Sequence, residues 1–402
     1  MGVAGADPDL IDGAVGLKRS DRLECRLRRA TGHLVPALLE GHGNPTRSFH
    51  GRRVSHVGRT ASGQTSGVGR VGAMAGDTTI EPDPGFWQAR TVLVTGGNGF
   101  LGRAVLDRLS VRRPGAVLAP TSDDYDLRDP LAVASMFADT RPDLVIHLAA
   151  RVGGIGANMA RPADLYLDNL LMGTYVLEEA RRRDTDKTVM VGTICSYPKF
   201  TPVPFAESSL WQGYPEETNA PYGIAKLAQL VQLQANRAQY GQRAVYLMPT
   251  NLYGPRDKFH PSVSHVIPAL IRKAVDARES GAASMEVWGT GSASREFLFV
   301  DDAAEGILRA AEFYDDGEPV NLGADRELPI RALVDIITEL VGFTGEVRWD
   351  TTKPDGQPRR GVDGSRARAA FGFVAETSFE QGLQLTLDWY LANRVEAESR
   401  VI

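Results

Sequence analysis

The sequence predicts an α/β protein with a doubly wound parallel sheet and a smaller α/β domain toward its C-terminus. One observation is a short apolar run over 91–95 that leads through a glycine-rich turn into a helical pattern. Another is that short apolar runs and longer amphipathic segments then alternate as far as residue 191. Because strands that alternate with helices form parallel sheets, ligands are expected beyond the carboxyl ends of the strands.

The first unit predicts a dinucleotide site. A run rich in β-branched residues over 91–95 is followed by Gly96, Gly99 and Gly102 and by a helix expected over 103–109. Glycines at this spacing allow a tight turn, let backbone N–H groups approach a pyrophosphate and let the helix pack on the strand. The pyrophosphate then lies at the positive N-terminal end of the helix. This combination is typical of a Rossmann-type fold.

The later units follow the same alternation. Their strands are short and rich in Val, Leu and Ile, and their helices are longer and carry apolar residues on one face. We expect strands over 115–119, 144–148 and 189–191, and helices over 130–140 and 162–183.

Composition excludes several function classes. No apolar run is long enough to span a membrane, and Asp7, Asp9 and Asp12 stand where a secretory signal would be basic and then apolar. Cys25 and Cys195 cannot form a disulfide framework, and the sequence has no CxxC or HExxH motif to suggest a metal site. The net charge of −5 gives no global attraction to nucleic acid. We therefore expect a cytoplasmic protein with no membrane, nucleic-acid or metal partner.

The stretch before the first unit differs from the rest. It is rich in glycine and arginine, and Phe49 is the only aromatic residue over 1–80. Such a segment buries too little apolar surface to offset the entropy of ordering it, so residues 1–85 are expected to be disordered. A basic arm for an acidic partner and a translation start at Met74 are the alternatives.

Two strand ends carry candidate catalytic side chains. Thr193 follows the strand expected over 189–191, and Tyr222 and Lys226 are four residues apart on a predicted helix. Because residues at this spacing share a helix face, the ammonium of Lys226 is expected to lower the phenol pKa of Tyr222 from its usual ~10. Thr193 can hydrogen-bond the same substrate oxygen. A Tyr and a Lys four apart also occur as solvated surface pairs, but their place after a glycine fingerprint favours catalysis.

The glycine fingerprint, Thr193, Tyr222 and Lys226, in this order, resemble the extended short-chain dehydrogenase/reductases. Further segments are similar to the branch of that family that acts on a GDP-linked 4-keto-6-deoxy-mannose. These segments are 152–158, 195–199, 217–222, 249–255, 259–261, 264–270, 287–291, 295–298 and 353–358. The resemblance extends from about Arg90 to Asn393.

The resemblance implies 3,5-epimerisation of GDP-4-keto-6-deoxy-D-mannose followed by hydride reduction at C4. Both inverted carbons are α to the C4 ketone, so their protons are removable when the enolate is stabilised. Tyr222, held by Lys226 and helped by Thr193, would hydrogen-bond that oxygen in both reactions. The resemblance places the acid and the base of the inversion at Cys195 and His265. On residue type alone, Cys195 is an apolar filler and His265 a loop cap.

The resemblance also implies which residues contact the ligands. The cofactor contacts come from the glycine turn, two strand ends and the catalytic group, and comprise Gly96, Gly97, Asn98, Gly99, Phe100, Leu101, Gly102, Val191, Gly192, Thr193, Ile194, Tyr222, Lys226, Pro249, Thr250, Asn251, Leu252 and His265. The substrate contacts are Lys273, Trp288, Arg295 and Asp355. Arg295 would grip a pyrophosphate through two parallel hydrogen bonds, whereas Lys273 offers only a charge where many relatives have Arg. Alternatively, Trp288 is a core residue and Arg295 pairs with Glu296 or Asp301.

The cofactor's second phosphate site departs from the family pattern. NADP users place basic groups at the end of the second strand, but residues 119–124 include none. Asp123 or Asp124 would accept a hydrogen bond from a ribose hydroxyl, and Arg103 would substitute for the missing charge by folding back. Ile194 also stands where relatives often have serine. NADP(H) is the expectation from the family, with NAD(H) as the alternative.

The expected domain division follows from these assignments. Residues 90–255 form the Rossmann-type NAD(P)-binding domain, to which a segment near 299–325 returns, and residues 256–298 and 326–395 form the substrate-binding domain. A homodimer that binds a GDP-sugar is implied by the resemblance. Three other functions stay open: an NAD-dependent nucleotide-sugar 4-epimerase, a ketoreductase for another GDP-keto sugar, and a non-enzymatic cofactor sensor.

Overall fold

The computed structural model describes residues 84–399 except 262 and 354. Residues 1–83, which hold nearly all of the extension expected to be disordered, together with Met74 and Cys25, lie outside the described residues. The described chain begins with a short helix, α2 (Pro84–Gln88).

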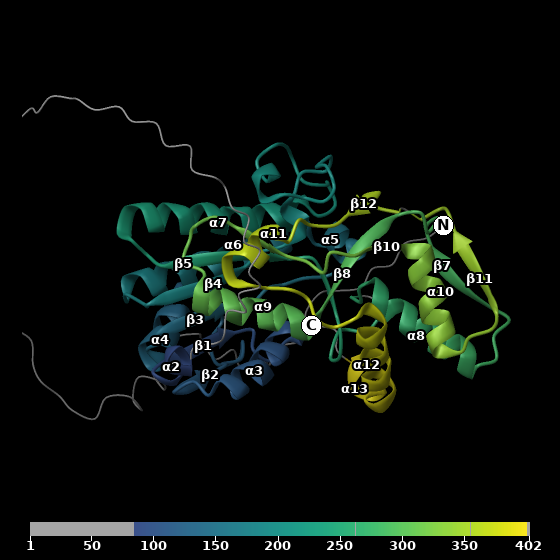
Figure 1. Cartoon of the computed structure of the whole chain (residues 1–402), viewed down its shortest axis with the longest axis horizontal. Helices are drawn as coiled ribbons and strands as arrows, with labels where there is room; N and C mark the ends of the chain where they lie inside the picture. Colours follow the sequence, from purple (N-terminus) through teal and green to yellow (C-terminus); the bar gives the residue numbers. More distant parts are fainter. Residues whose placement is uncertain (1–83, 262, 354, 400–402) are drawn as a thin grey trace, which may run out of the picture. The chain divides into compact units, whose positions relative to one another are not determined.

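A six-stranded parallel sheet organises the first part of the described chain (Figure 1). Its strands are β1 (Thr91–Thr95), β2 (Ala116–Leu118), β3 (Leu144–His147), β4 (Lys187–Val191), β5 (Ala244–Pro249) and β9 (Val320–Leu322). They lie in the order β2-β1-β3-β4-β5-β9, and every neighbouring pair is parallel. The chain moves from β1 outward to β2 and then crosses to β3 on the other side, so the expected doubly wound sheet is confirmed. The crevice between β1 and β3 is where such sheets bind ligands.

Helices cover both faces of this sheet. They are α3 (Phe100–Arg112), α4 (Pro130–Thr140), α5 (Ile155–Ala160), α6 (Pro162–Arg182), α7 (Ala220–Tyr240), α9 (Val300–Phe313) and α11 (Ser365–Phe371). Alternate strand residues serve opposite faces, since Val92 and Val94 pack with α3 and α9 whereas Leu93 packs with α4 and α6. Strands that are covered on both faces consist of continuous runs of apolar residues, and the sequence has such runs at these strands.

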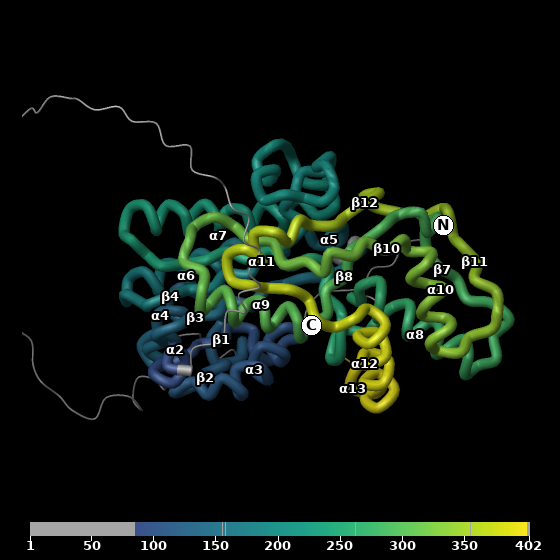
Figure 2. The backbone as a smooth tube through the Cα atoms, in the orientation of Figure 1, coloured from purple at the N-terminus to yellow at the C-terminus, as the bar shows by residue number. Residues whose placement is uncertain are grey.

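A second group of elements forms its own apolar core. It comprises β6 (Asn251–Tyr253), α8 (Val266–Glu279), β7 (Ser284–Trp288), β8 (Ser294–Phe299), β10 (Glu327–Pro329), α10 (Ile330–Val341), β11 (Glu346–Asp350), β12 (Arg359–Arg360), α12 (Phe379–Ala392) and α13 (Arg394–Ser399). β8 pairs with β6, β10 and β12, and β7 pairs with β11. The tube in Figure 2 shows that α12 and α13, which end the described chain, lie near α8 in this group.

Several element bounds differ from the expectation for physical reasons. The helix expected over 103–109 is longer, because α3 begins directly after Gly99, which has an extended backbone at the N-cap. β4 begins two residues before the strand expected over 189–191. Its first residue, Lys187, is buried because its ammonium donates to the carbonyls of Ala310 and Ala311 at the end of α9.

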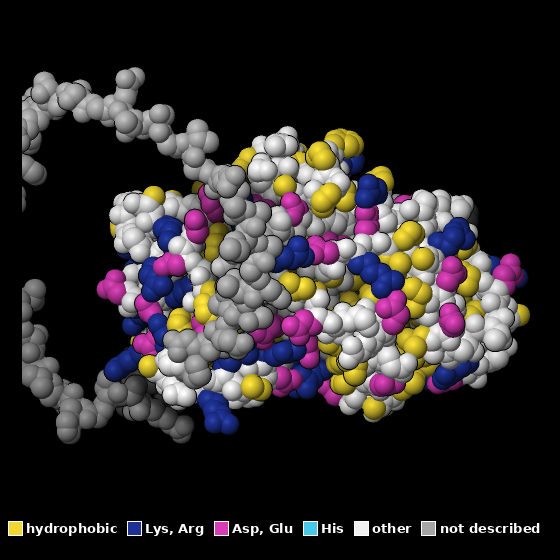
Figure 3. Space-filling view, in the orientation of Figure 1, with side chains coloured by type: hydrophobic (Ala, Val, Ile, Leu, Met, Phe, Trp, Pro, Cys, Tyr) yellow, Lys and Arg dark blue, Asp and Glu magenta, His cyan; other side chains and the backbone are white. Residues whose placement is uncertain are grey.

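Charged side chains of both signs are interspersed on the face shown in Figure 3. No helix in the described part of the chain is long and apolar enough to cross a membrane.

Candidate active site

The turn after β1 is shaped for close backbone approach. A Cβ added to Gly102 would lie 2.1 Å from the carbonyl oxygen of Gly96, and one added to Gly97 would lie 2.7 Å from the Cβ of Ala119. Gly96 has a φ of +73°, which favours glycine. The turn therefore leaves the N-terminus of α3 open at the crevice between β1 and β3, so these residues fit a dinucleotide pyrophosphate.

The end of β4 places Thr193 and Cys195 together. The Thr193 side chain caps a 3-10 turn, η1 (Ile194–Ser196), by accepting a hydrogen bond from the backbone N–H of Cys195 at 3.2 Å. Cys195 is half-buried. The Ile194 side chain is buried in an apolar cluster that includes Leu177 and Met190. Packing thus accounts for the isoleucine where relatives often have serine.

Tyr222 and Lys226 reach the same place from α7. The helix lies close against η1, because a Cβ added to Gly223 would be 2.6 Å from the carbonyl oxygen of Cys195. Lys226 is 2% exposed, and its ammonium donates to the carbonyl of Val191 at 2.9 Å. Burial lowers the pKa of Lys226 to about 8. These contacts put the ammonium at the carboxyl end of β4, and Tyr222 lies one helical turn earlier on α7.

The expected effect of Lys226 on the phenol pKa is wrong for this structure. Burial and the nearby Cys195 raise the pKa of Tyr222, and only a hydrogen bond with Thr193 opposes them. Burial of the phenol outweighs the charge of Lys226, whose ammonium is engaged with the Val191 carbonyl and is itself costly to bury. Tyr222 therefore stays protonated well above neutral pH, which suits a proton donor.

His147 lies behind this group and was not anticipated from the sequence. It ends β3, is fully buried, and its Nδ1 lies 2.8 Å from the hydroxyl oxygen of Thr95. Burial and the charge of Lys226 hold the pKa of His147 well below its usual range. The imidazole is therefore neutral, and the positive charge in this buried region belongs to Lys226.

Two arginines of the second group of elements lie near Cys195, the buried Arg360 and the half-buried Arg295. β12 pairs with β8 so that Arg360 lies opposite Arg295, and a guanidinium nitrogen of Arg360 is 3.7 Å from the sulfur of Cys195. Burial and the charge of Arg360 lower the pKa of Arg295 to about 10. Within the described residues neither arginine has a carboxylate within ion-pair distance. Two unneutralised guanidinium groups at one place favour an anionic ligand.

Arg360 was missed from the sequence, although residues 353–358 were singled out immediately before it. Its side chain is buried and also donates to the amide oxygen of Gln357 at 3.2 Å. Arg360 is hard to recognise from the sequence, because an arginine in a strand of only two residues looks like an ordinary exposed charged residue.

Trp288 is at the end of β7 and is 60% exposed, so the alternative that it is a core residue is wrong. The ammonium groups of Lys273 and Lys353 lie 5.7 and 5.4 Å from its ring centroid. Lys353 was not among the expected contacts. An exposed indole with two ammonium groups near its ring is suited to stack on an aromatic base whose phosphates lie nearby.

Arg295 and Asp355 are joined, but not through their charges. Arg295 donates to the backbone carbonyl of Asp355 at 3.2 Å, while the Asp355 carboxylate accepts from the N–H and hydroxyl of Thr290 at 2.7 Å each. Pairing of Arg295 with Glu296 does not occur, because the Glu296 carboxylate accepts from backbone N–H groups of Ala324, Asp325 and Val362. Asp301 does not pair with Arg295 in the described structure either.

The other expected contacts lie at neighbouring strand ends. Pro249 ends β5, the N–H of Thr250 donates to the carbonyl of Leu322 at 2.9 Å, and the amide of Asn251 donates to the carbonyl of Glu296 at 2.8 Å. His265 is the N-cap residue of α8. Among contacts of the described residues there is none between Cys195 and His265.

Arg103 on α3 is the cation that the sequence suggested for the end of β2, and its side chain folds back against the glycine turn. The Asn98 amide donates to the carbonyl of Ala119 at 3.3 Å, and the Nε of Arg103 donates to the carbonyl of Asn98 at 3.3 Å. The Asp124 carboxylate accepts from the N–H and hydroxyl of Thr121 at 2.8 Å each. Arg103 thus lies against the turn that contacts β2.

Known proteins identify the family. Residues 92–323 match the NAD dependent epimerase/dehydratase family. The chain belongs to this family. GDP-L-fucose synthase 1 of Arabidopsis thaliana is 43% identical over 302 residues, which cover 75% of this chain and 93% of that protein. The GDP-L-fucose synthase of Escherichia coli (strain K12) is 39% identical over 312 residues, 75% of this chain and 97% of that protein.

A solved structure agrees with these relatives. The GDP-L-fucose synthetase of Naegleria fowleri bound to NADP has a TM-score of 0.71 and 30% sequence identity, and the match covers 78% of this chain and 97% of that chain. The similarity to the branch expected from the sequence is therefore confirmed.

Proposed function

We propose that this chain catalyses the GDP-L-fucose synthase reaction with NADP(H). It inverts C3 and C5 of GDP-4-keto-6-deoxy-D-mannose and then reduces C4. The observation that carries the proposal is the convergence of Tyr222, Thr193 and Cys195 at the end of β4, opposite Arg295 and Arg360. The identity to GDP-L-fucose synthases over most of the chain supports it.

One oxygen site serves both reactions. Tyr222 and Thr193 hydrogen-bond the C4 oxygen, so negative charge that develops on it during enolisation is stabilised. In the reduction, Tyr222 gives its proton to the C4 oxygen; a nicotinamide cofactor held at the glycine turn would supply the hydride. Lys226 keeps a positive charge beside the phenolate that results, which lowers the cost of that proton transfer.

The inversion uses an acid and a base at the carbons next to the ketone. Cys195 removes the proton from one face, and His265 delivers a proton to the other. A guanidinium nitrogen of Arg360 lies 3.7 Å from the Cys195 sulfur, so the thiol stands beside the pair of arginines that would hold the substrate. A simple 4-epimerase needs no such pair at the α-carbons, so the surroundings of Cys195 favour inversion over that alternative.

The nucleotide end of the substrate is bound by the second group of elements. Trp288 would stack on the guanine with Lys273 and Lys353 nearby, and Arg295 with Arg360 would hold the pyrophosphate. The glycine turn and α3 would hold the cofactor pyrophosphate, with the contacts expected from the sequence.

A product analysis tests this function. The protein is mixed with a panel of nucleotide 4-keto sugars, NADPH or NADH is supplied separately, and products are identified by NMR. We expect one equivalent of reduced cofactor to be consumed with formation of GDP-L-fucose. Turnover without net cofactor consumption would instead identify a 4-epimerase.

We also propose a homodimer formed through α6 and α7, which are packed against each other. Leu167 on α6 and Val231 and Tyr240 on α7 are each about half exposed. Light scattering tests the mass in solution, and a monomer that stays fully active would contradict the proposal. The cytoplasmic location stays a prediction.

A further inference from the structure

A buried glutamine connects Arg360 to the loop that follows Cys195. Gln357 is 7% exposed, and its side-chain amide nitrogen donates to the backbone carbonyl of Lys199 at 2.8 Å. Its amide oxygen accepts a hydrogen bond from the Nε of Arg360 at 3.2 Å. Both polar ends of this side chain are thus used, one on each side of the site.

The backbone on either side of Arg360 is held as well. The N–H of Ser294 on β8 donates to the carbonyl of Pro358 at 2.9 Å, and the N–H of Phe205 donates to the carbonyl of Gly361 at 2.8 Å. Phe205 belongs to the same connection between η1 and α7 that contains Lys199. The main chain at Arg360 is therefore fixed from two directions, and the direction of its long side chain is what remains to be set.

The hydrogen bond with Gln357 sets that direction. A guanidinium is planar with its donors in a rigid fork, so holding its Nε at one acceptor also orients the two terminal nitrogens. One of them lies 3.7 Å from the sulfur of Cys195, and the other has no hydrogen-bond partner within the described residues. Arg360 therefore faces the thiol with one nitrogen and keeps the other for a ligand.

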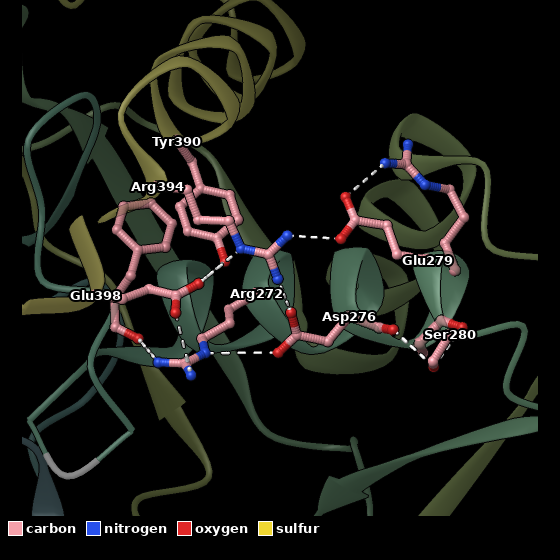
Figure 4. Close-up of polar contacts among 10 residues, drawn as sticks. Arg272, Asp276, Glu279, Ser280, Tyr390, Arg394 and Glu398 are labelled. Carbon is pink, nitrogen blue, oxygen red and sulfur yellow. Dashed lines mark hydrogen bonds and ion pairs between the residues drawn. The ribbon is translucent and has the colours of Figure 1, made fainter. Parts of the chain in front are cut away.

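Arg394 on α13 shows the more usual way in which this fold holds an arginine (Figure 4). It pairs with Asp276 and lies 2.6 Å from a carboxylate oxygen of Glu279, so its charge is neutralised. An amide oxygen accepts the same kind of hydrogen bond without a charge of its own. Gln357 thus fixes Arg360 as a carboxylate would, but leaves its positive charge to attract an anion.

We propose that Gln357 is a positioning residue, which holds the Arg360 guanidinium in place for the pyrophosphate of the substrate. The inference rests on the proposed function, because that function assigns the pyrophosphate to Arg295 and Arg360. A side chain that is already ordered before the ligand arrives loses less rotamer entropy on binding. Gln357 therefore strengthens binding of the diphosphate and takes no part in proton or hydride transfer.

Gln357→Leu tests the inference in the full chain, because leucine has a similar size but makes neither hydrogen bond. Titration calorimetry with GDP measures binding without turnover, and cofactor oxidation with the keto sugar gives KM and kcat. We expect the Kd of GDP and the KM of the sugar to rise about five- to tenfold while kcat changes less than about twofold. A purely structural role would instead lower the yield of folded protein and leave the Kd of the folded fraction unchanged, which would overturn the inference.

Gln357→Glu separates the hydrogen bond from the charge, and it also serves if Gln357→Leu does not fold. A glutamate still accepts from the Nε of Arg360, but it neutralises the guanidinium and repels a diphosphate. We expect the Kd of GDP to rise about tenfold or more. GDP binding as tight as that of the unmodified protein would contradict the idea that a neutral partner keeps the charge available.

Gln242→Leu is the matched control. Gln242 is also 7% exposed, donates to the carbonyl of Leu177 at 3.0 Å and accepts from the side-chain amide of Asn236 at 2.9 Å. It lies two residues before β5, at the end of the sheet opposite to the site. We expect its Kd, KM and kcat to equal those of the unmodified protein. An equal loss of GDP binding in this variant would show that the effect is not specific to Gln357, and the inference would fail.

Arg360→Ala distinguishes failure of the inference from failure of the proposed function. If this variant binds GDP weakly while Gln357→Leu binds it normally, the inference is overturned and the assignment of Arg360 to the pyrophosphate stands. If Gln357→Leu and Arg360→Ala both weaken GDP binding but the unmodified protein forms no GDP-L-fucose, the positioning stands and the proposed reaction is contradicted.

Discussion

The two halves of the proposed reaction are held by the fold in different ways. The reduction group, Tyr222, Thr193 and Lys226, belongs to one parallel sheet and its covering helix, and backbone contacts fix it. The inversion group, Cys195 and His265 with Arg360, comes from three segments, two of them in the second group of elements. The comparison shows that a strand end can place a reaction centre locally, whereas opposite faces of a sugar require groups from separate parts of the chain.

The electrostatics of the two groups differ in the same way. The reduction group is deeply buried, so the pKa of Tyr222 is raised and that of Lys226 is lowered. Within the inversion group, Cys195 lies beside guanidinium groups that lack carboxylate partners among the described residues. Reduction thus depends on a dry site with one cation, and inversion on a site that an anionic substrate completes.

The largest expected effect is that of Tyr222→Phe. Removal of the phenol proton should lower the reduction rate by about 10²–10⁴, because Tyr222 is the group that gives its proton to the C4 oxygen and Thr193 only hydrogen-bonds it. Cofactor oxidation with the keto sugar measures it. Deuterium exchange should fall as well, since the same hydroxyl stabilises the enolate. Turnover at the unmodified rate would refute this role for the phenol.

Cys195→Ser should separate the two groups. A serine hydroxyl is a far weaker base than a thiolate, so inversion should fall by about 10² or more while reduction continues. NMR should then show a reduced, uninverted GDP-sugar. The thiol is not the base if deuterium still enters C3 and C5 at the normal rate.

The sequence was most informative where structure is local. The strand over 91–95 and the helix over 130–140 have the expected bounds, because β-branched runs and a proline at a helix start are local signals. The glycine spacing likewise predicted the turn after β1. Each of these features depends on residues within one strand–turn–helix unit.

The rest depends on contacts between distant segments. Arg360 was missed because only the pairing of β12 with β8 brings it to Arg295 and Cys195. The effect of Lys226 on Tyr222 was predicted wrongly because helix spacing says nothing about the depth of burial or the Val191 carbonyl.

The pH dependence of reduction should show whether the reduction group depends on the charge of Lys226. Burial lowers the pKa of Lys226 to about 8, so its ammonium loses its proton as the pH rises through that value. The pKa of Tyr222 is raised, so the phenol keeps its proton in the same range. We expect kcat/KM for reduction to fall above pH 8, approaching about tenfold per pH unit.

Lys226→Arg is the companion variant, because a guanidinium keeps its charge through this range. The decline above pH 8 should disappear even if the rate at pH 7 is lower. If the decline above pH 8 persisted unchanged in this variant, a titrating group other than Lys226 would be its cause.

The smallest expected effect concerns the end of β2, where the sequence alone did not decide between NADP and NAD. Arg103 is folded against Asn98, and the Asp124 carboxylate is held by Thr121. A new cation at Ser122 would therefore not compete with either side chain for its place. Ser122→Arg should shift the ratio of dissociation constants toward NADP over NAD by about tenfold, since a hydrogen bond to a charged group contributes about 1.5–3 kcal/mol. Titration of each cofactor followed by thermal shift measures it. An unchanged ratio, with selectivity lost in Arg103→Ala, would mean that Arg103 already binds the 2′-phosphate and that the turn, not the strand end, sets cofactor choice.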